Sequence, residues 1–326
     1  MATNYDKKFL TYNQQMKKLR NDKHIECNGS PHKRILVRSG YFNLINGYKN
    51  PFVSGIDTNG NHIYMAGTSL DQIYTVKQFD EKLRSLLLRY ITSVEEEVRT
   101  LTGYKFDTEN DNGSVHWYDV KAYDPSEPLK NRMHAISKAY QEISQSHVDY
   151  VQFYMEHHSE IPTWIMIKNV NFSTFINVLN YSKKDVKHSI CKLYGMIDQH
   201  NLPDVKLLIG SLHWMRVVRN SCAHNERIYC LSKENGRIIE KYFLQLRPSY
   251  KRERTQHIFD LFIYFKYYLP SDEFQAFISE FKTMFLTLKA KIETHAFENI
   301  SGQIGIKQLS DLDDLVDRKL ISHTNG

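Results

Sequence analysis

The amino-acid sequence predicts a mainly α-helical fold with an N-terminal helical extension and one or two small β-hairpins. Apolar residues recur at three- and four-residue steps through much of the chain, as they do on the buried face of a helix. Strand-like stretches are short and few. The 326 residues are 41% hydrophobic and 25% charged, which are proportions of an ordinary folded protein. They argue against disorder, a collagen-like repeat or a small disulfide scaffold.

The clearest helix is expected over residues 75–100, where charged residues separate a regular apolar stripe. Shorter or looser helical patterns follow along the chain, with a polar loop at 107–114 and a break at Pro270. Asn201 is a candidate cap and Pro203 a candidate first residue for the helix that contains 205–218. The other expected helices cover residues 129–154, 172–179, 184–196, 258–268 and 272–297.

Two Asn-Gly pairs predict the hairpins, because this dipeptide suits a two-residue turn between strands. Asn59-Gly60 lies between Ile56 and residues 62–64. Asn235-Gly236 lies between residues 228–231 and 238–239. We find no internal repeat or obvious linker. Residues 1–70 are therefore expected to form a basic extension packed on a helical domain of residues 71–326, as one compact unit.

Cysteine usage and the N-terminal sequence indicate a cytoplasmic protein. The four cysteines contain no Cys-x-x-Cys pair, and a chain of this size does not need disulfides, so free thiols in a reducing compartment are expected. The first residues lack the apolar stretch of a signal peptide, and no run approaches the roughly 20 apolar residues of a membrane span. We expect no membrane association.

The net charge of +6 is concentrated in two segments. Residues 1–50 carry a net charge of +7 and residues 216–254 carry +6, whereas the rest of the chain carries −7. If the two segments face one groove, they form a positive surface suited to a polyanion. The alternative is two unrelated solvated stretches.

The second basic segment contains an Arg-x4-His pattern, Arg219 to His224. The spacing alone is weak, since the chain contains two further matches. The neighbouring residues favour the first pair, because apolar residues anchor the helix around it and other polar groups accompany it. The two other matches, in a solvated stretch and near the C-terminus, are Arg252/His257 and Arg318/His323.

Helical geometry places Arg216, Asn220 and His224 near one face, with Arg227 close by. Asn220 is then a candidate for orienting the His224 ring. Arg219 lies about 140° away around the helix, so joining His224 requires a long reach or a local break.

Several sequence segments together resemble one known family. Residues 219–227 read Arg-Asn-x-x-Ala-His-Asn-x-Arg, similar to the Arg-x4–6-His motif of HEPN-domain proteins. Residues 40–49, the Phe79-Asp80-x-x-Leu83-Arg84 segment and Pro162-x-Trp164 resemble further signatures of one branch. That branch comprises the Abi-type abortive-infection proteins of bacteria, of the AbiD/AbiF type. Residues 230–255 look like an insertion relative to that pattern.

The resemblance implies a HEPN-like helical bundle that acts as a metal-independent endoribonuclease, usually as a homodimer, without a cofactor and controlled by a small structured RNA. Imidazole titrates near 6.5 and suits proton transfer during attack by a ribose 2′-OH, whereas arginine binds phosphate with a permanent charge. The implied catalytic residues are His224 as acid or base, Arg219 on the phosphate and Asn220 as orienting group. From the two basic segments, the residues expected to bind RNA are Arg216, Arg227, Lys49, Arg38, Lys251 and Arg252.

Three alternatives remain open. A catalytically inactive HEPN protein would bind a small structured RNA without cutting it, and an interaction scaffold would bind no RNA. Cys222, His224 and Cys230 resemble a fragment of a metal site, but a fourth ligand and paired spacing are missing. No glycine-rich phosphate-binding motif is present, so a nucleotide-driven enzyme is not supported.

Overall fold

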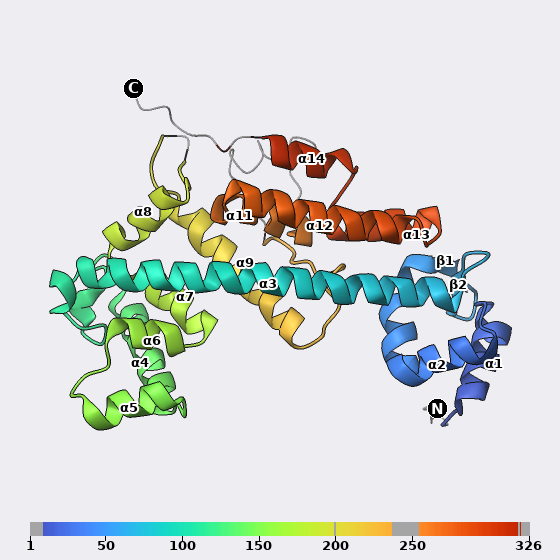
Figure 1. Cartoon of the computed structure of the whole chain (residues 1–326), viewed down its shortest axis with the longest axis horizontal. Helices are drawn as coiled ribbons and strands as arrows, with labels where there is room; N and C mark the ends of the chain where they lie inside the picture. The colour runs from blue at the N-terminus through green and yellow to red at the C-terminus, as the bar shows by residue number, and fades with distance from the viewer. Residues whose placement is uncertain (1–8, 199, 237–253, 319, 321–326) are drawn as a thin grey trace.

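The computed structural model describes residues 9–198, 200–236, 254–318 and 320. The fold is mainly α with one small antiparallel sheet, as the sequence predicts (Figure 1). The strands are β1 (Val53–Ile56) and β2 (His62–Tyr64). The helices are α1 (Tyr12–Lys23), α2 (Gly29–Ser39), α3 (Leu70–Thr108), α4 (Leu129–Ser144), α5 (Asp149–His157), α6 (Thr163–Asn169), α7 (Phe172–Tyr181), α8 (Lys184–Leu193), α9 (Val205–Ala223), α11 (Ile258–Tyr268), α12 (Ser271–Lys289), α13 (Thr294–Ile304) and α14 (Ser310–Asp317).

Helix α3 is the axis of the molecule. It contains 39 residues and is therefore about 58 Å long. Ser69 caps its first turn by accepting a hydrogen bond from the Gln72 N–H, at 3.2 Å. Helices α6, α8, α9 and α12 all pack against α3. In Figure 1, α11 to α14 lie on one side of α3 and α4 to α7 on the other, which explains why apolar residues occupy so much of its circumference.

The N-terminal segment gathers at the first turns of α3 (Figure 1). Backbone hydrogen bonds join Glu26 to Thr68 and Leu70, both at 2.9 Å. The far end of the chain meets the same region, because the Asn299 side chain on α13 donates to the Pro51 carbonyl at 3.0 Å. The N-terminal segment is thus packed against elements from both halves of the chain.

The first predicted hairpin is confirmed, although its loop is longer than two residues. Strands β1 and β2 pair antiparallel, and residues 57–61 connect them. The Asp57 carboxylate accepts from the Asn59 and Asn61 N–H groups, at 2.8 and 2.7 Å. This Asx-type turn supplies the bonds that a tight two-residue turn would otherwise make.

The second predicted hairpin, around Asn235-Gly236, is wrong in its first strand. Residues 228–231 form a turn rather than a strand, and a single antiparallel bridge joins Lys233 to Gln256. The reason is tertiary, because the backbone N–H groups at 228 and 229 bond a side chain of α3. The second arm, residues 238–239, lies outside the described residues.

Two long helical predictions correspond to pairs of helices. Residues 129–154 split into α4 and α5, because the Ser146 hydroxyl accepts from the Val148 N–H and donates to Asn169, at 3.3 and 3.1 Å. Residues 272–297 split between α12 and α13, with Glu293 capping α13 through the Ala296 N–H at 3.0 Å. Serine side chains that bond the local backbone compete with helix continuation.

The predicted start of α9 is corrected by three residues. The cap is Asp204, which accepts from the Leu207 N–H at 2.9 Å, not Asn201. Asn201 has φ +60° and belongs to the preceding turn, and Pro203 precedes the cap. At the polar loop, α3 continues to Thr108 before a short 3₁₀ turn. None of the helices in the described ranges combines the length and apolar composition needed to cross a membrane.

Candidate functional site

Helix α9 ends in a way that exposes His224. The Glu226 N–H donates to the Ser221 carbonyl at 2.9 Å, and Asn225 has φ +56°. These are the marks of a Schellman ending, in which asparagine tolerates the left-handed conformation better than most residues. His224 occupies the cap position and is exposed. Its imidazole makes no hydrogen bond to any residue that the structure describes.

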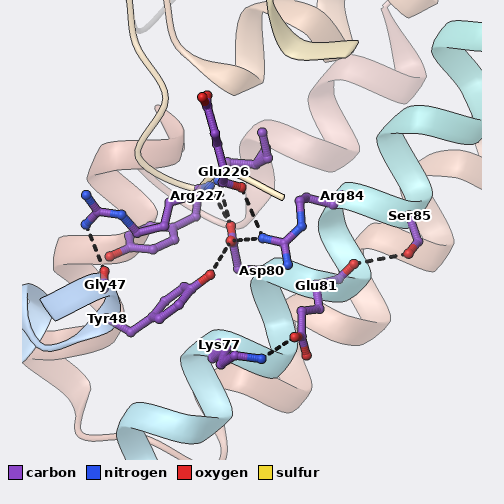
Figure 2. Close-up of polar contacts among 11 residues, drawn as sticks. Gly47, Tyr48, Lys77, Asp80, Glu81, Arg84, Ser85, Glu226 and Arg227 are labelled. Carbon is purple, nitrogen blue, oxygen red and sulfur yellow. Dashed lines mark hydrogen bonds and ion pairs between the residues drawn. The ribbon is translucent and has the colours of Figure 1, made fainter. Parts of the chain in front are cut away.

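The loop after α9 is held by one buried carboxylate on α3, that of Asp80 (Figure 2). One oxygen accepts from the Ile228 and Tyr229 backbone N–H groups, both at 2.9 Å. The other accepts from the Tyr48 hydroxyl at 2.9 Å and from the Arg84 guanidinium at 2.6 Å. We call this set of contacts the Asp80 clamp, because it joins the N-terminal segment, α3 and the post-α9 loop.

Arg84 extends the clamp by donating to the Glu226 carbonyl at 3.1 Å. Burial raises the pKa of the Asp80 carboxyl, whereas the Tyr229 N–H and Arg84 are the main groups that lower it. Burial and the neighbouring Asp80 also raise the pKa of Tyr48, so its hydroxyl stays protonated and donates. All four acceptor positions of Asp80 are satisfied, as a buried carboxylate requires.

A pocket of about 1020 Å³ opens beside His224; we call it the His224 pocket. One wall is a π-helical turn, Phe42–Asn46, a rare conformation that is frequent at functional sites. The second wall is α3 and the third is the loop after α9. Lining residues from these walls include Phe42, Asn46, Lys77, Arg84, His224 and Arg227.

Cations from both basic segments line this pocket. Arg38 at the end of α2 is exposed and forms no ion pair within the described ranges. Arg227 donates to the Gly47 carbonyl at 2.8 Å, which leaves the rest of its guanidinium on the surface (Figure 2). Lys77 forms an ion pair with Glu81, one turn later on α3, and both residues line the pocket. The charge pattern therefore predicts the shared groove correctly for Arg38 and Arg227.

Arg219 lies in a different place from His224. Helix α9 is regular through Ala223, so the angle of about 140° between the two side chains is kept. The Arg219 Nε lies 3.8 Å from a carboxylate oxygen of Glu95, farther along α3. Arg219 lines a second pocket of about 490 Å³, which we call the Arg219 pocket. Within one chain, the expected pairing of Arg219 with His224 is not formed.

The structure separates the other predicted residues as well. The Asn220 side chain accepts from Arg219 at 3.3 Å and does not bond the His224 ring; only its backbone carbonyl meets the His224 N–H. Arg216 is half-buried, with its Nε unpaired in the described structure, and does not line the His224 pocket. Lys49 lies near Lys23 and does not line that pocket.

Lys251 and Arg252 lie outside the described residues. Cys222, His224 and Cys230 belong to no cluster of metal ligands in the part of the chain that the structure describes. No group of three or more histidine, cysteine or acidic side chains that could hold a metal ion occurs there.

The sequence predicts no site role for Asp80 and does not predict that Tyr48 bonds it. A signal was nevertheless present. Asp80 falls on the apolar stripe of α3 between Val76 and Leu83, where a charged residue must find buried partners. Arg84 follows one turn later and supplies one of them. The partners from the post-α9 loop could not be read from the sequence.

Comparison with known proteins identifies the family. A family model described as "Abi-like protein" matches residues 34–230. The match covers more than half of the chain, so this chain belongs to the family of Abi-like proteins. It begins within α2 and includes the π-helical turn, α3, α9 and the whole Asp80 clamp, and it ends within the loop that the clamp holds. No curated protein and no solved structure matches the chain.

Proposed function

We propose that this protein is a metal-independent endoribonuclease of a bacterial abortive-infection system, a HEPN protein of the AbiD/AbiF type. Membership in the Abi-like family favours abortive infection as the setting. The observation that carries the enzymatic proposal is the exposed, unbonded imidazole of His224 at a pocket that Arg38 and Arg227 make basic. RNA cleavage by a ribose 2′-OH requires a proton-transfer group and positive charge near the phosphate. An imidazole can serve as the first, and two arginines, which keep their charge, can serve as the second.

In the proposed reaction, a base removes the proton of a ribose 2′-OH and the oxygen attacks the adjacent phosphorus. An acid protonates the departing 5′-oxygen, which leaves a 2′,3′-cyclic phosphate and a free 5′-hydroxyl. Atoms and charges balance without a metal or cofactor. Arg38 and Arg227 would hold phosphate groups of the strand by charge-assisted hydrogen bonds.

A homodimer completes this chemistry. His224 is the only histidine among the described residues that line its pocket, and one imidazole cannot supply both proton-transfer roles at once. A second copy would supply the other imidazole. It would also bring an Arg219, which faces a different pocket within its own chain, to the phosphate. RNA is thus the proposed substrate, and a small structured RNA the proposed regulator.

The decisive test is incubation of the purified protein with single-stranded RNA in excess EDTA. We expect internal cleavage and fragments that end in a 2′,3′-cyclic phosphate, detected by their resistance to poly(A) tailing until a phosphatase removes the cyclic end. Cleavage that appears only on addition of a divalent metal, or fragments with free 3′-hydroxyls, would contradict the proposal.

The second candidate function is RNA binding without cleavage. The observation that favours it is the separation of Arg219 from His224 in the single chain. This candidate predicts salt-sensitive RNA binding and no cleavage at any protein concentration, whereas the ribonuclease predicts cleavage that rises with dimer formation.

Both candidates predict that Arg38 and Arg227 contribute to RNA affinity. Each Arg→Ala change should weaken binding at low salt and reduce the slope of log affinity against log salt by about 1. Filter binding across a salt series measures this slope. The matched control is Arg34→Ala, one turn earlier on α2, since Arg34 is exposed but does not line the pocket. Equal slopes for Arg38→Ala and Arg34→Ala would exclude a phosphate contact at Arg38.

A further inference from the structure

The Arg219 pocket is separate from the His224 pocket of the same chain and has the features of a binding site in its own right. It lies between α3 and α6 and its volume of about 490 Å³ is within the range of small-molecule sites. Gly103 on α3 faces α6, and a Cβ atom there would make ordinary van der Waals contacts, 3.8 Å from the Ile167 Cδ1 and 3.9 Å from the Trp164 Cα. Trp164 on α6 is 58% exposed, although an indole of this size is usually largely buried.

The floor of the pocket is a fixed ion-pair network. Two nitrogens of Arg99 donate to the same oxygen of Glu95, at 3.0 and 2.7 Å, and a third donates to the Ile167 carbonyl on α6. Arg99 and Glu95 are each largely buried, so Arg99 is committed to holding α3 and α6 together. The pocket is therefore preformed rather than assembled by a ligand.

Arg219 is the second guanidinium on that single carboxylate. Arg99 already satisfies Glu95, and Arg219 reaches only its other oxygen with Nε at 3.8 Å. The Arg219 side chain is 40% exposed. Lys168, also exposed, lines the same pocket; its ammonium lies over the Tyr150 ring, 5.3 Å from the centroid, and forms no ion pair within the described structure. With Glu96 as the one further acid in the lining, the pocket keeps a net positive charge.

We propose that the Arg219 pocket binds one unpaired nucleotide, with its base stacked on Trp164 and its phosphate held by Arg219 and Lys168. An exposed indole offers a flat face that any base can stack on, and such stacking tolerates any sequence. A guanidinium left partly unpaired beside an ammonium selects a phosphate rather than a neutral ring. Neither cation alone nor the indole alone would define this ligand class; their meeting in one pocket does.

The inference deepens the proposed function, and rests on it in taking RNA as the natural ligand. The binding test does not depend on cleavage. Trp117 and Trp214 are 2% and 1% exposed, so Trp164 is the one of the three tryptophans that solvent and ligands reach. Stacking of a base on Trp164 should therefore quench the red-shifted part of the intrinsic emission.

The probes are adenosine 5′-monophosphate, adenosine, ribose 5-phosphate and a short 2′-O-methyl oligoadenylate, which lacks the attacking hydroxyl and cannot be cut. We expect saturable quenching by the nucleotide and the oligonucleotide, weaker quenching by adenosine and none by ribose 5-phosphate. Arg219→Gln should weaken nucleotide binding and leave adenosine binding unchanged, so that the nucleotide keeps only the part of its advantage that Lys168 supplies. Equal binding of nucleotide and adenosine by the unaltered protein, or no saturable quenching, would overturn the proposal.

A labelled oligonucleotide gives a second measurement by fluorescence anisotropy. Trp164→Leu should weaken its binding about 5- to 150-fold, the range that loss of one stacked base produces. Trp164→Phe should restore most of the affinity, because phenyl rings also stack. Tyr104→Leu is the matched control, since Tyr104 is an exposed aromatic on α3 outside the pocket lining. An equal loss in Tyr104→Leu, or no loss in Trp164→Leu, would overturn the site.

Failure of this site and failure of the proposed function give different results. Saturable quenching with no cleavage of RNA keeps the nucleotide site and removes the ribonuclease. Cleavage in EDTA with no quenching removes the nucleotide site and keeps the ribonuclease.

Discussion

Replacing His224 with alanine is expected to lower the rate of RNA cleavage by about 100-fold or more while leaving the fold intact. Loss of one general acid or base costs about 100- to 10,000-fold in rate. The side chain is exposed and unbonded in the described structure, so its removal should change the free energy of unfolding by no more than about 0.5 kcal/mol. The rate is measured on a labelled single-stranded RNA in EDTA, and the fold by circular dichroism.

His134→Ala is the matched control for this change. His134 is likewise exposed, but it lies on α4 and outside both pockets described above. Its substitution should leave the cleavage rate unaltered. Full activity in His224→Ala, with both proteins equally folded, would show that the cleaving group lies elsewhere.

The same variant tests the proposed dimer. If each cleavage event needs two His224 side chains, mixed dimers are inactive, and activity should fall with the square of the wild-type fraction after subunit exchange at constant total protein. A linear decline of activity with the wild-type fraction would mean that each chain cleaves RNA alone. The second proton-transfer group would then have to come from the His224 pocket of the same chain.

The helices were predictable because their causes are local. The apolar stripe of α3 and the pattern of α11 follow from residues three and four positions apart, and the bounds of α11 agree with the expectation at both ends. The predicted hairpins were wrong in detail where a side chain forms hydrogen bonds with backbone groups, either in its own turn or far away in the sequence. Asp57 enlarged the hairpin loop, and Asp80 drew residues 228–229 out of the predicted strand.

The site was predictable only in part for a similar reason. Helical angles correctly keep Arg219 away from His224, and nothing in α9 breaks before the cap. What the sequence could not provide was the partner of each residue on α3. Arg219 lies beside Glu95, whereas His224 lines a pocket with Lys77 and Arg84. Arg84 precedes Glu95 on α3 by some 16 Å, at about 1.5 Å per residue.

Loss of the Asp80 clamp is expected to lower the free energy of unfolding more than loss of the exposed ion pairs does. Asp80→Ala would remove the acceptor of four hydrogen bonds at once. Arg84, whose side chain is 10% exposed, would then remain as a buried charge without its carboxylate. Breaking a buried pair by removing one partner costs about 3–5 kcal/mol of unfolding free energy. The two backbone N–H groups add to this unless water reaches them.

Urea unfolding followed by circular dichroism measures this loss, with Asp71→Ala as the matched control on the same helix. Asp71 pairs with His32 at 2.8 Å, but its side chain is 67% exposed, so its removal should cost about 1 kcal/mol or less. A cost for Asp80→Ala no greater than that for Asp71→Ala would mean that the buried carboxylate does not hold the loop. Asp80→Asn should fall between the two, because its amide oxygen can still accept from Ile228 and Tyr229 while its NH₂ group faces Arg84. A cost for Asp80→Asn close to that for Asp80→Ala would assign the larger share of the clamp to its charge, whereas a cost close to that for Asp71→Ala would assign it to the backbone contacts that fix the loop beside His224.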